Sequence, residues 1–487
     1  MFNIKKVFST SVTLILLAVI TRLLGFIREI IIAYYFGTSS LVDLYVSSQI
    51  LGELVGNVIL VGSFSTYTVL ALNKNGDGIF KKVQYIGTCI SVILVMFIIL
   101  NKSTIANFIS LGSNPYEIEL LTQYIIYLAP TIVMLTITSI FNGYLQYKRN
   151  FLHPVVAIIY MNIGFIISVF ILKGVGEQYI LPISYLISII IYLIYSSSVY
   201  ICFKKKRTIV KNSNIDSYKN IFSELMPIII TMTVMKVTLI TDRMFGGLLE
   251  EGQLASYNYS LKLMNLPVAI IATSLINIMF VNFSKSRNEN ELGLQYTDLL
   301  LKLSIFVSIF TFGFSQELVS LIFGYGEFGE KAIIMTGAIL KLLAITIPLQ
   351  FIYMFYNKVV YAVLTSRIIM FVSIIGIIVN IFINILLVPV MGVKAIVLST
   401  ILSLSIQCII YNKLVLGIAM PWFNKGTLIL TASLLLVISS LKLISFDNDI
   451  NLVICLLLYT ASFYLIDKII KQNVIRKVMK LGDYKVN

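Results

Sequence analysis

The sequence has little of what soluble enzymes and secreted domains are built with. Charged residues make up 12% of its 487 residues, and His153 and Trp422 are the only histidine and tryptophan. The cysteines lie far apart and lack CxxC spacing; they are Cys89, Cys202, Cys408 and Cys455. A histidine-based metal site, a catalytic triad and a disulfide framework therefore lack their components, and we expect a protein that is not an enzyme.

Apolar residues dominate the chain instead. They make up 58% of it, and the mean hydropathy is +0.95. Runs of about 20 apolar residues, each long enough to cross ~30 Å of hydrocarbon, recur along the sequence. We therefore predict an all-α polytopic membrane protein with about 14 transmembrane helices. The predicted spans are residues 9–35, 41–72, 83–101, 119–146, 151–172, 179–202, 221–246, 253–283, 297–323, 331–362, 367–389, 392–412, 426–443 and 450–467.

Basic residues are distributed unevenly among the connections. Most Lys and Arg residues lie in both tails and in the connections after even-numbered spans, as Lys81, Lys148 and Lys285 do. The odd-numbered connections are nearly free of them. The positive-inside rule then predicts a bacterial cytoplasmic (inner) membrane protein with both termini in the cytoplasm. The net charge of +15 is thereby assigned to topology and to contact with anionic membrane lipids, and no nucleic-acid partner is expected.

The longest basic connection divides the predicted spans into two groups. Residues 204–220, which begin with the run KKKR, follow the sixth span and are predicted to form a cytoplasmic linker. The linker would separate an N-lobe of six spans at 1–203 from a C-lobe of six spans at 221–413. Spans 13 and 14 and a basic tail would follow at 414–487. Spans one and two also echo spans seven and eight, and repeats of this kind commonly hold a substrate between the lobes.

Ionisable side chains inside the predicted spans are the first candidates for function. A charge at such a depth costs from ~2.5 to more than ~10 kcal/mol unless it finds a partner or water. Arg22 and Arg28 in span one and Lys262 in span eight are too deep to reach the membrane surface easily. Lining a cavity, they would suit an anionic ligand such as a phosphate or pyrophosphate. The alternative for Arg28 is a structural pair with Glu29 or Asp43.

Three further cations have simpler predicted roles. Arg243 ends span seven, and its side chain is expected to extend to the outer headgroups. Lys302 and Lys358 lie close to the inner ends of spans nine and ten. Both are predicted to anchor their helices at the membrane interface.

Several longer segments carry a more specific signal. The first is ITRLLGFIREIIIAYYFGTSSLVDLYV at 20–46, whose Arg-x-x-Gly-Phe-x-Arg-acid core is not a general feature of membrane helices. Further segments are GSFS at 62–65, YNYSLKLMNLP at 257–267, LIFGYGEFGEKA at 321–332 and NIFINILLVPVMGVKAIVLST at 380–400. In these segments the chain resembles the MurJ (MviN) family of lipid II flippases, which belongs to the MOP exporter superfamily.

The resemblance implies a flippase with a cationic central cavity that opens alternately to each side and takes the pyrophosphate of lipid II. Carried over by motif, the cations of that cavity would be Arg22, Arg28 and Lys262. Lys262 replaces a family arginine, which keeps the charge but loses the bidentate fork of a guanidinium. Asp43 would be the acidic partner.

The resemblance also implies a sodium site. Asp242, Asn380, Asn384, Thr400 and the carbonyl of Ile396 fall on the positions that hold an ion in some members of the family. Oxygen ligands suit a hard cation, and two asparagines at i and i+4 share one face of a helix. The alternative is that these asparagines join helices by hydrogen bonds. No cofactor is expected beyond such a coupling ion.

Two departures from the family pattern keep other functions open. The second-span arginine of the family falls on Gly56, and an acid of the family falls on Val61. The leading hypothesis is a flippase for a polyprenyl-pyrophosphate-linked saccharide, with lipid II as first candidate. The departures support a rival, a flippase for another lipid-linked oligosaccharide of capsule, exopolysaccharide or teichoic acid. A multidrug antiporter of the same superfamily would need an acidic, aromatic cavity, whereas the deep charges here are mainly basic.

Overall fold

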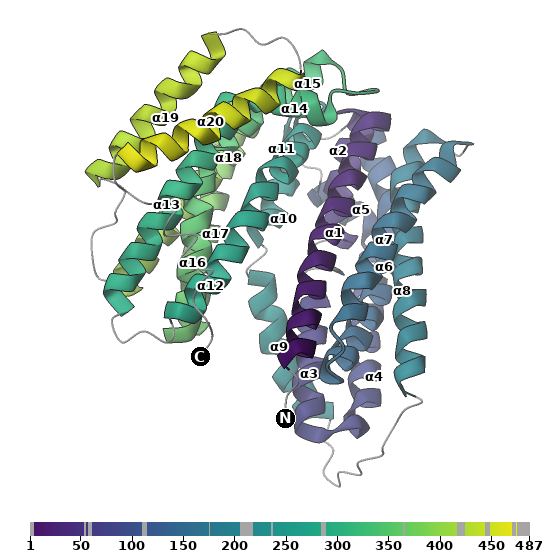
Figure 1. Cartoon of the computed structure of the whole chain (residues 1–487). Coiled ribbons are helices and arrows are strands. Elements are labelled where there is room, and N and C mark those ends of the chain that lie inside the picture. Colours follow the sequence, from purple (N-terminus) through teal and green to yellow (C-terminus); the bar gives the residue numbers. More distant parts are fainter. Residues whose placement is uncertain are drawn as a thin grey trace. The chain divides into compact units, whose positions relative to one another are not determined.

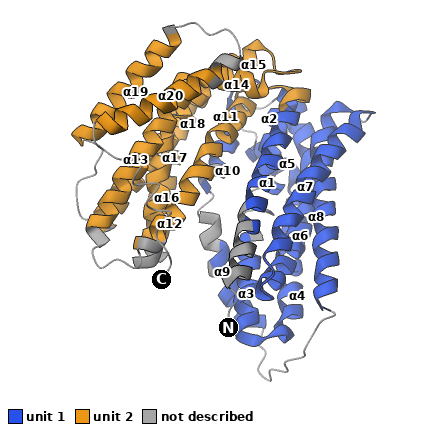
Figure 2. Ribbon diagram, viewed as in Figure 1, with its two compact units in different colours: residues 1–32, 39–251 blue, residues 33–38, 252–487 orange. Residues whose placement is uncertain are grey.

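The described part of the chain is helical throughout. The computed structural model describes residues 4–52, 55–56, 61–109, 114–174, 176–204, 218–234, 237–283, 289–363, 366–415, 424–443, 449–469 and 474. Every regular element within these ranges is a helix (Figure 1). The predicted all-α class is therefore confirmed. The described residues divide into two compact units, which are coloured separately in Figure 2.

Unit 1 comprises residues 1–32 and 39–251. Its helices are α1 (Ile4–Phe36, of which the last four residues belong to unit 2), α2 (Ser40–Gln49), α3 (Val61–Asn75), α4 (Phe80–Leu100), α5 (Lys102–Ile109), α6 (Pro115–Tyr147), α7 (Leu152–Ile171), α8 (Ile180–Lys204), α9 (Tyr218–Val234) and α10 (Val237–Met244). Helix α6 forms the core of the unit, since it packs against α2, α3, α4, α5 and α8. It begins with a capping box, in which Asn114 and Glu117 exchange hydrogen bonds, and Pro115 occupies its first turn.

Unit 2 comprises residues 33–38 and 252–487. Its helices are α11 (Gln253–Pro267), a π-helical segment (Val268–Ala272), α12 (Thr273–Phe283), α13 (Glu289–Gly313), α14 (Ser315–Phe323), α15 (Glu330–Leu343), α16 (Thr346–Val363), α17 (Ser366–Met391), α18 (Val393–Val415), α19 (Lys425–Leu443) and α20 (Asp449–Ile469). Helix α16 is central here, because it packs against α12, α13, α17 and α18.

The number of spanning helices is a finer prediction than the fold class. Among the described residues, nine helices are long and apolar enough to cross a membrane, or ten if the bent pair α15–α16 counts as one span. The exact count of 14 therefore stays a prediction. The predicted span 297–323 was wrong as a single helix, because α13 ends at Gly313 and α14 starts at Ser315.

The bend in the span 331–362 has an identifiable cause. The axes of α15 and α16 differ by 47°, and the break comes just before Pro348. Proline fits the first turn of a helix but interrupts the preceding hydrogen bonds. Hydroxyl groups satisfy carbonyls at the break, since Ser308 Oγ donates to Ala344 O (2.7 Å) and Thr346 Oγ1 donates to Leu343 O (2.7 Å).

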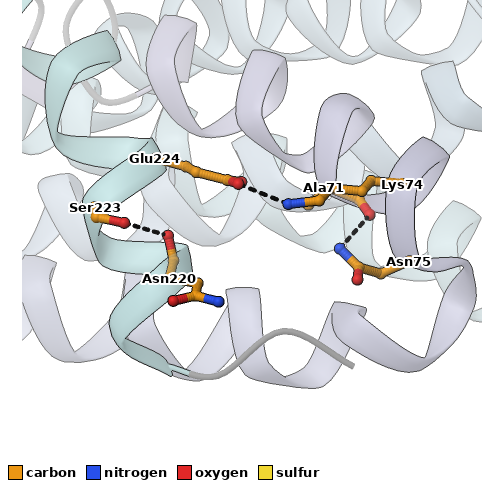
Figure 3. A network of polar contacts seen from close by, with 6 residues as sticks. All are labelled: Ala71, Lys74, Asn75, Asn220, Ser223 and Glu224. Carbon is orange, nitrogen blue, oxygen red and sulfur yellow. Dashed lines mark hydrogen bonds and ion pairs between the residues drawn. The ribbon is translucent and has the colours of Figure 1, made fainter. Parts of the chain in front are cut away.

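The division into units differs from the predicted lobes over residues 221–251, which lie in unit 1. Helix α9 packs there against α3, and Lys74 Nζ on α3 lies 2.7 Å from Glu224 Oε1 on α9 (Figure 3). Most of the predicted linker at 204–220 lies outside the described residues. The lobe boundaries themselves stay a prediction.

Candidate functional site

The first span holds a buried ion pair. Arg28 is 8% exposed and Glu29 is 2% exposed, and Arg28 Nη2 lies 2.9 Å from Glu29 Oε1. The guanidinium also lies over the ring of Phe165 on α7, 5.3 Å from its centroid. The pairing with Glu29, which the sequence left as the alternative to an anion-binding role, is therefore present. A guanidinium offers five N–H donors, and the contact with Glu29 uses one at Nη2.

Arg22 and Asp43 are placed differently from Arg28. Arg22 is exposed on α1, and its position six residues before Arg28 turns the two side chains about 120° apart on the helix. Asp43 is half-buried in the first turn of α2, where its negative charge interacts favourably with the helix dipole. Arg22 and Arg28 thus differ in exposure although they lie on the same helix.

Gly56, the position of the missing arginine, is a packing site. The residue is buried, and a Cβ atom built there would lie only 2.6 Å from Leu135 Cδ1 and 3.7 Å from Ile132 Cα on α6. Glycine therefore lets this segment approach the core helix closely. A side chain at this position would require the end of Leu135 on α6 to move.

Lys262 lies in unit 2, on the half-buried side of α11. The opposite face of α11 is fixed to α15, since Ser260 Oγ donates a hydrogen bond to Thr336 O (2.9 Å). At 100° per residue, Lys262 points about 160° away from Ser260. Its side chain therefore projects from the face of α11 that does not pack on α15.

The asparagines of the predicted sodium site lie in a polar cluster between α17 and α18. Asn380 Nδ2 donates to Ser399 Oγ (3.0 Å), and Asn384 Nδ2 donates to Asn380 Oδ1 (3.3 Å). The hydroxyl groups of Ser399 and Thr400 both donate to Ile396 O, at 2.8 and 2.9 Å. The bond between Asn380 and Ser399 joins the two helices, as the alternative interpretation expected, whereas the other three lie within α17 or α18. The oxygen donor set also has the chemistry that a hard cation needs.

Asp242, the remaining predicted sodium ligand, belongs to unit 1. It is buried on α10, whereas the four other predicted ligands belong to unit 2. The joint geometry of the five ligands thus stays a prediction. Within the described ranges, no group of three or more His, Cys, Asp or Glu side chains could hold a metal ion.

Sequence reasoning missed two features of unit 2. Lys302 was expected at the interface, but it is 1% exposed and pairs with Asp298 one turn earlier on α13. The spacing of four residues between acid and base was a visible signal for this pair. Ser399 was also missed as the partner of Asn380, because the family pattern pointed to the neighbouring Thr400.

Comparisons with known proteins agree on one family. The family model described as lipid II flippase MurJ matches residues 32–458. A probable lipid II flippase MurJ from Buchnera aphidicola subsp. Acyrthosiphon pisum is 27% identical over 349 residues, which cover 67% of this chain and 68% of the relative.

Two solved structures show the fold. A lipid II flippase MurJ in an inward closed conformation matches with a TM-score of 0.84 at 19% identity, and the match covers 95% of this chain and 100% of that chain. An inward-facing multidrug resistance MATE family transporter of the MOP superfamily matches with a TM-score of 0.65 at 12% identity, over 80% of this chain and 92% of that chain. The likeness to both extends over most of each molecule.

Proposed function

Since the chain belongs to the MurJ family of lipid II flippases, we propose that it moves lipid II from the inner to the outer leaflet of the bacterial cytoplasmic membrane. The observation that carries this proposal is the family match over residues 32–458. Its substrate class is a lipid-linked saccharide, and no covalent bond is formed or broken. The protein is thus a transporter and not an enzyme.

The cations of the spans supply the physical basis of this transport. A pyrophosphate cannot cross hydrocarbon without counter-charges, and Arg22, Arg28 and Lys262 are the residues that we propose to provide them. Glu29 limits the net charge at Arg28, so that the anion would be held and still released. The saccharide would pass along these cations by alternating access while the polyprenyl chain stays in the lipid.

We infer from the Lys and Arg distribution that both termini are cytoplasmic. Reporter fusions at the C-terminus that distinguish the two sides of the membrane test this orientation. Activity of a C-terminal reporter that works only outside the cytoplasm would refute this orientation.

Complementation of a conditional lipid II flippase mutant tests the proposed function. We expect the wild-type gene to restore growth and outer-leaflet exposure of lipid II. Arg28→Ala and Lys262→Ala should fail at normal expression, whereas Lys262→Arg should retain function because it keeps the charge. Lys341→Ala is the matched control, because Lys341 is an exposed lysine of unit 2 outside the proposed site. Normal insertion of the wild-type protein without rescue would refute the lipid II assignment.

Gly56 favours a second candidate, a flippase for another lipid-linked oligosaccharide. Its close packing on α6 removes a cation that the family pattern places in span two. Depletion of the protein in its own host distinguishes the two candidates. Accumulation of lipid II supports the first, and accumulation of a different lipid-linked intermediate supports the second.

We also propose that Asp242 and the α17–α18 cluster bind a sodium ion that drives transport. The amide oxygens of Asn380 and Asn384, the Thr400 hydroxyl and the Ile396 carbonyl fit such an ion by their oxygen chemistry. Sodium should then raise the melting temperature of the purified protein more than potassium does. This difference should vanish in Asp242→Asn and in Asn380→Leu. Equal melting temperatures of the wild type in sodium and potassium salts would refute the sodium site, and the asparagines would then serve to join α17 and α18.

A further inference from the structure

Unit 2 contains a pocket between α12 and α16 whose lining does not include Lys262. It has a volume of about 410 Å³. Its lining includes Thr273, Ile276 and Asn277 of α12 and Tyr353, Asn357 and Lys358 of α16. The volume falls within the ~300–1,000 Å³ of small-molecule sites, and an apolar wall with a few polar groups is typical of such sites.

The polar groups of this α12–α16 pocket combine a cation with two amides. Lys358 Nζ donates a hydrogen bond to Asn277 Oδ1 and lies 5.6 Å from the centroid of the Phe280 ring. Because an amide carries no charge, this pair keeps a full positive charge. The buried Oδ1 of Asn357 has no hydrogen-bond partner among the described residues. The pocket can therefore bind an anion, and the Asn277 and Asn357 side chains of its lining add polar amide groups.

Contacts with α18 hold α16 in place beside the pocket. Tyr356 Oη on α16 donates to Asn412 Oδ1 on α18 (2.9 Å), and the ring of the lining residue Tyr353 lies 5.8 Å from that of Tyr411. On the α12 side, the π-helical segment Val268–Ala272 directly precedes the pocket. Such widened turns occur often at functional sites. The pocket is thus formed by firmly packed helices and not by loops.

The pocket lies at the end of unit 2 that the sequence assigns to the cytoplasm. Helix α12 ends at Phe283, shortly before Lys285 and Arg287, and α16 ends at Val363, shortly before Arg367. From Lys262 to Asn277 the chain continues as helix for 15 residues, which corresponds to a rise of about 22 Å. Unit 2 therefore has two cationic positions, Lys262 deep on α11 and Lys358 on α16, whose partner Asn277 lies nearer the cytoplasmic end of the span that carries Lys262.

We propose that the α12–α16 pocket binds the phosphosugar part of the lipid-linked saccharide when it enters from the cytoplasmic leaflet. This inference rests on the proposed function. Lys358 meets a phosphate oxygen as a point charge, and the amides of Asn277 and Asn357 bind sugar hydroxyl groups. Ile276 and Tyr353 contact the apolar face of a sugar ring. The substrate is held here before it moves along the span to Lys262.

Binding measurements on the full-length protein in phosphatidylcholine nanodiscs test this pocket. The probes are lipid II, undecaprenyl phosphate and phosphatidylglycerol. Lys358→Gln should lower the affinity for lipid II about tenfold, because a hydrogen bond to a charged group is lost. It should leave phosphatidylglycerol binding unchanged, and Lys358→Arg should bind lipid II nearly as well as the wild type. Lys341→Gln is the matched control, since Lys341 also lies over an aromatic ring, Phe312 at 4.9 Å, but outside the pocket.

The possible failures of this experiment can be told apart. A wild-type protein that does not prefer lipid II to phosphatidylglycerol would refute the proposed function. If the wild type prefers lipid II and Lys358→Gln binds it equally well, only the pocket proposal is refuted. An equal loss for all three probes would refute the saccharide assignment, because it indicates a site for lipid phosphate in general. If Lys358→Gln does not fold, Asn277→Ala at the exposed edge of the pocket replaces it. The same three binding measurements are then made, and their outcomes are interpreted in the same way.

Discussion

Arg28 in unit 1 and Lys358 in unit 2 are both cations on span helices, but they have partners of different kinds. Arg28 is almost fully buried beside the carboxylate of Glu29, so the pair is formally neutral. Lys358 is half-buried beside the amide of Asn277, so the positive charge remains. A buried charge needs a counter-charge for the fold to be stable, whereas a charge at an open pocket can be left for a ligand. The kind of partner thus separates a cation that also stabilises the fold from one whose full charge is left for a ligand.

The largest effect is expected when the carboxylate of unit 1 is removed. Glu29→Gln removes the carboxylate that is paired with the buried Arg28, which should cost about 3–5 kcal/mol of unfolding free energy. Unfolding of the purified protein in detergent measures this loss. The double variant R28Q/E29Q should recover much of it, because neither charge is then left alone. A Glu29→Gln protein as stable as the wild type would remove the contrast between the two cations.

A smaller effect is expected for the amides that join helices in unit 2. Asn380→Leu removes the bonds to Ser399 and Asn384 and should cost about 1–2 kcal/mol, in the range measured for hydrogen bonds between membrane helices. Ser405→Ala is the control, because Ser405 Oγ donates only within its own helix, to Ile401 O at 2.7 Å. The same unfolding measurement applies. Equal losses for both variants would show that the bonds across helices add nothing.

The smallest effect is expected for the exposed ion pair of unit 1 between Lys74 and Glu224. Their side chains are 55% and 43% exposed, so solvent and salt screen the interaction (Figure 3). A double-mutant cycle with Lys74→Gln and Glu224→Gln should give a coupling below about 1 kcal/mol that decreases with salt. A coupling energy above about 2 kcal/mol would mean that solvent exposure does not determine how strongly an ion pair stabilises this protein.

The regular spans could be predicted from the sequence, but their interruptions could not. The spans at 83–101 and 119–146 correspond to α4 and α6, because long apolar runs leave a membrane helix as the one stable solution. Hydropathy is an average along the chain and does not detect a bend. The break before Pro348 and the end of α13 at Gly313 were therefore missed, although both residue types are known helix interrupters.

The candidate site was predicted in its residue types and not in its contacts. The sequence named Glu29 and Asp43 as equal candidates to pair with Arg28, because the choice depends on how side chains turn around α1. Lys358 was assigned to the interface on depth alone. Its role in a pocket depends on Asn277, which is 81 residues away in the sequence and joins it only through the packing of α12 against α16.

The hydrogen bond between Asn380 and Ser399 also bears on the order of synthesis. Its partners are only 19 residues apart, on two helices joined by a tight turn at Gly392, whose φ is +56°. Insertion of a single span with two asparagines into lipid is unfavourable. Here α18 supplies Ser399 as a hydrogen-bond partner for Asn380 as soon as α18 has been synthesised. Helices α17 and α18 can therefore insert as one hairpin before α19 and α20 exist. A nascent chain arrested after α18 should already hold both helices in the bilayer, so this part of the protein can assemble without waiting for its end.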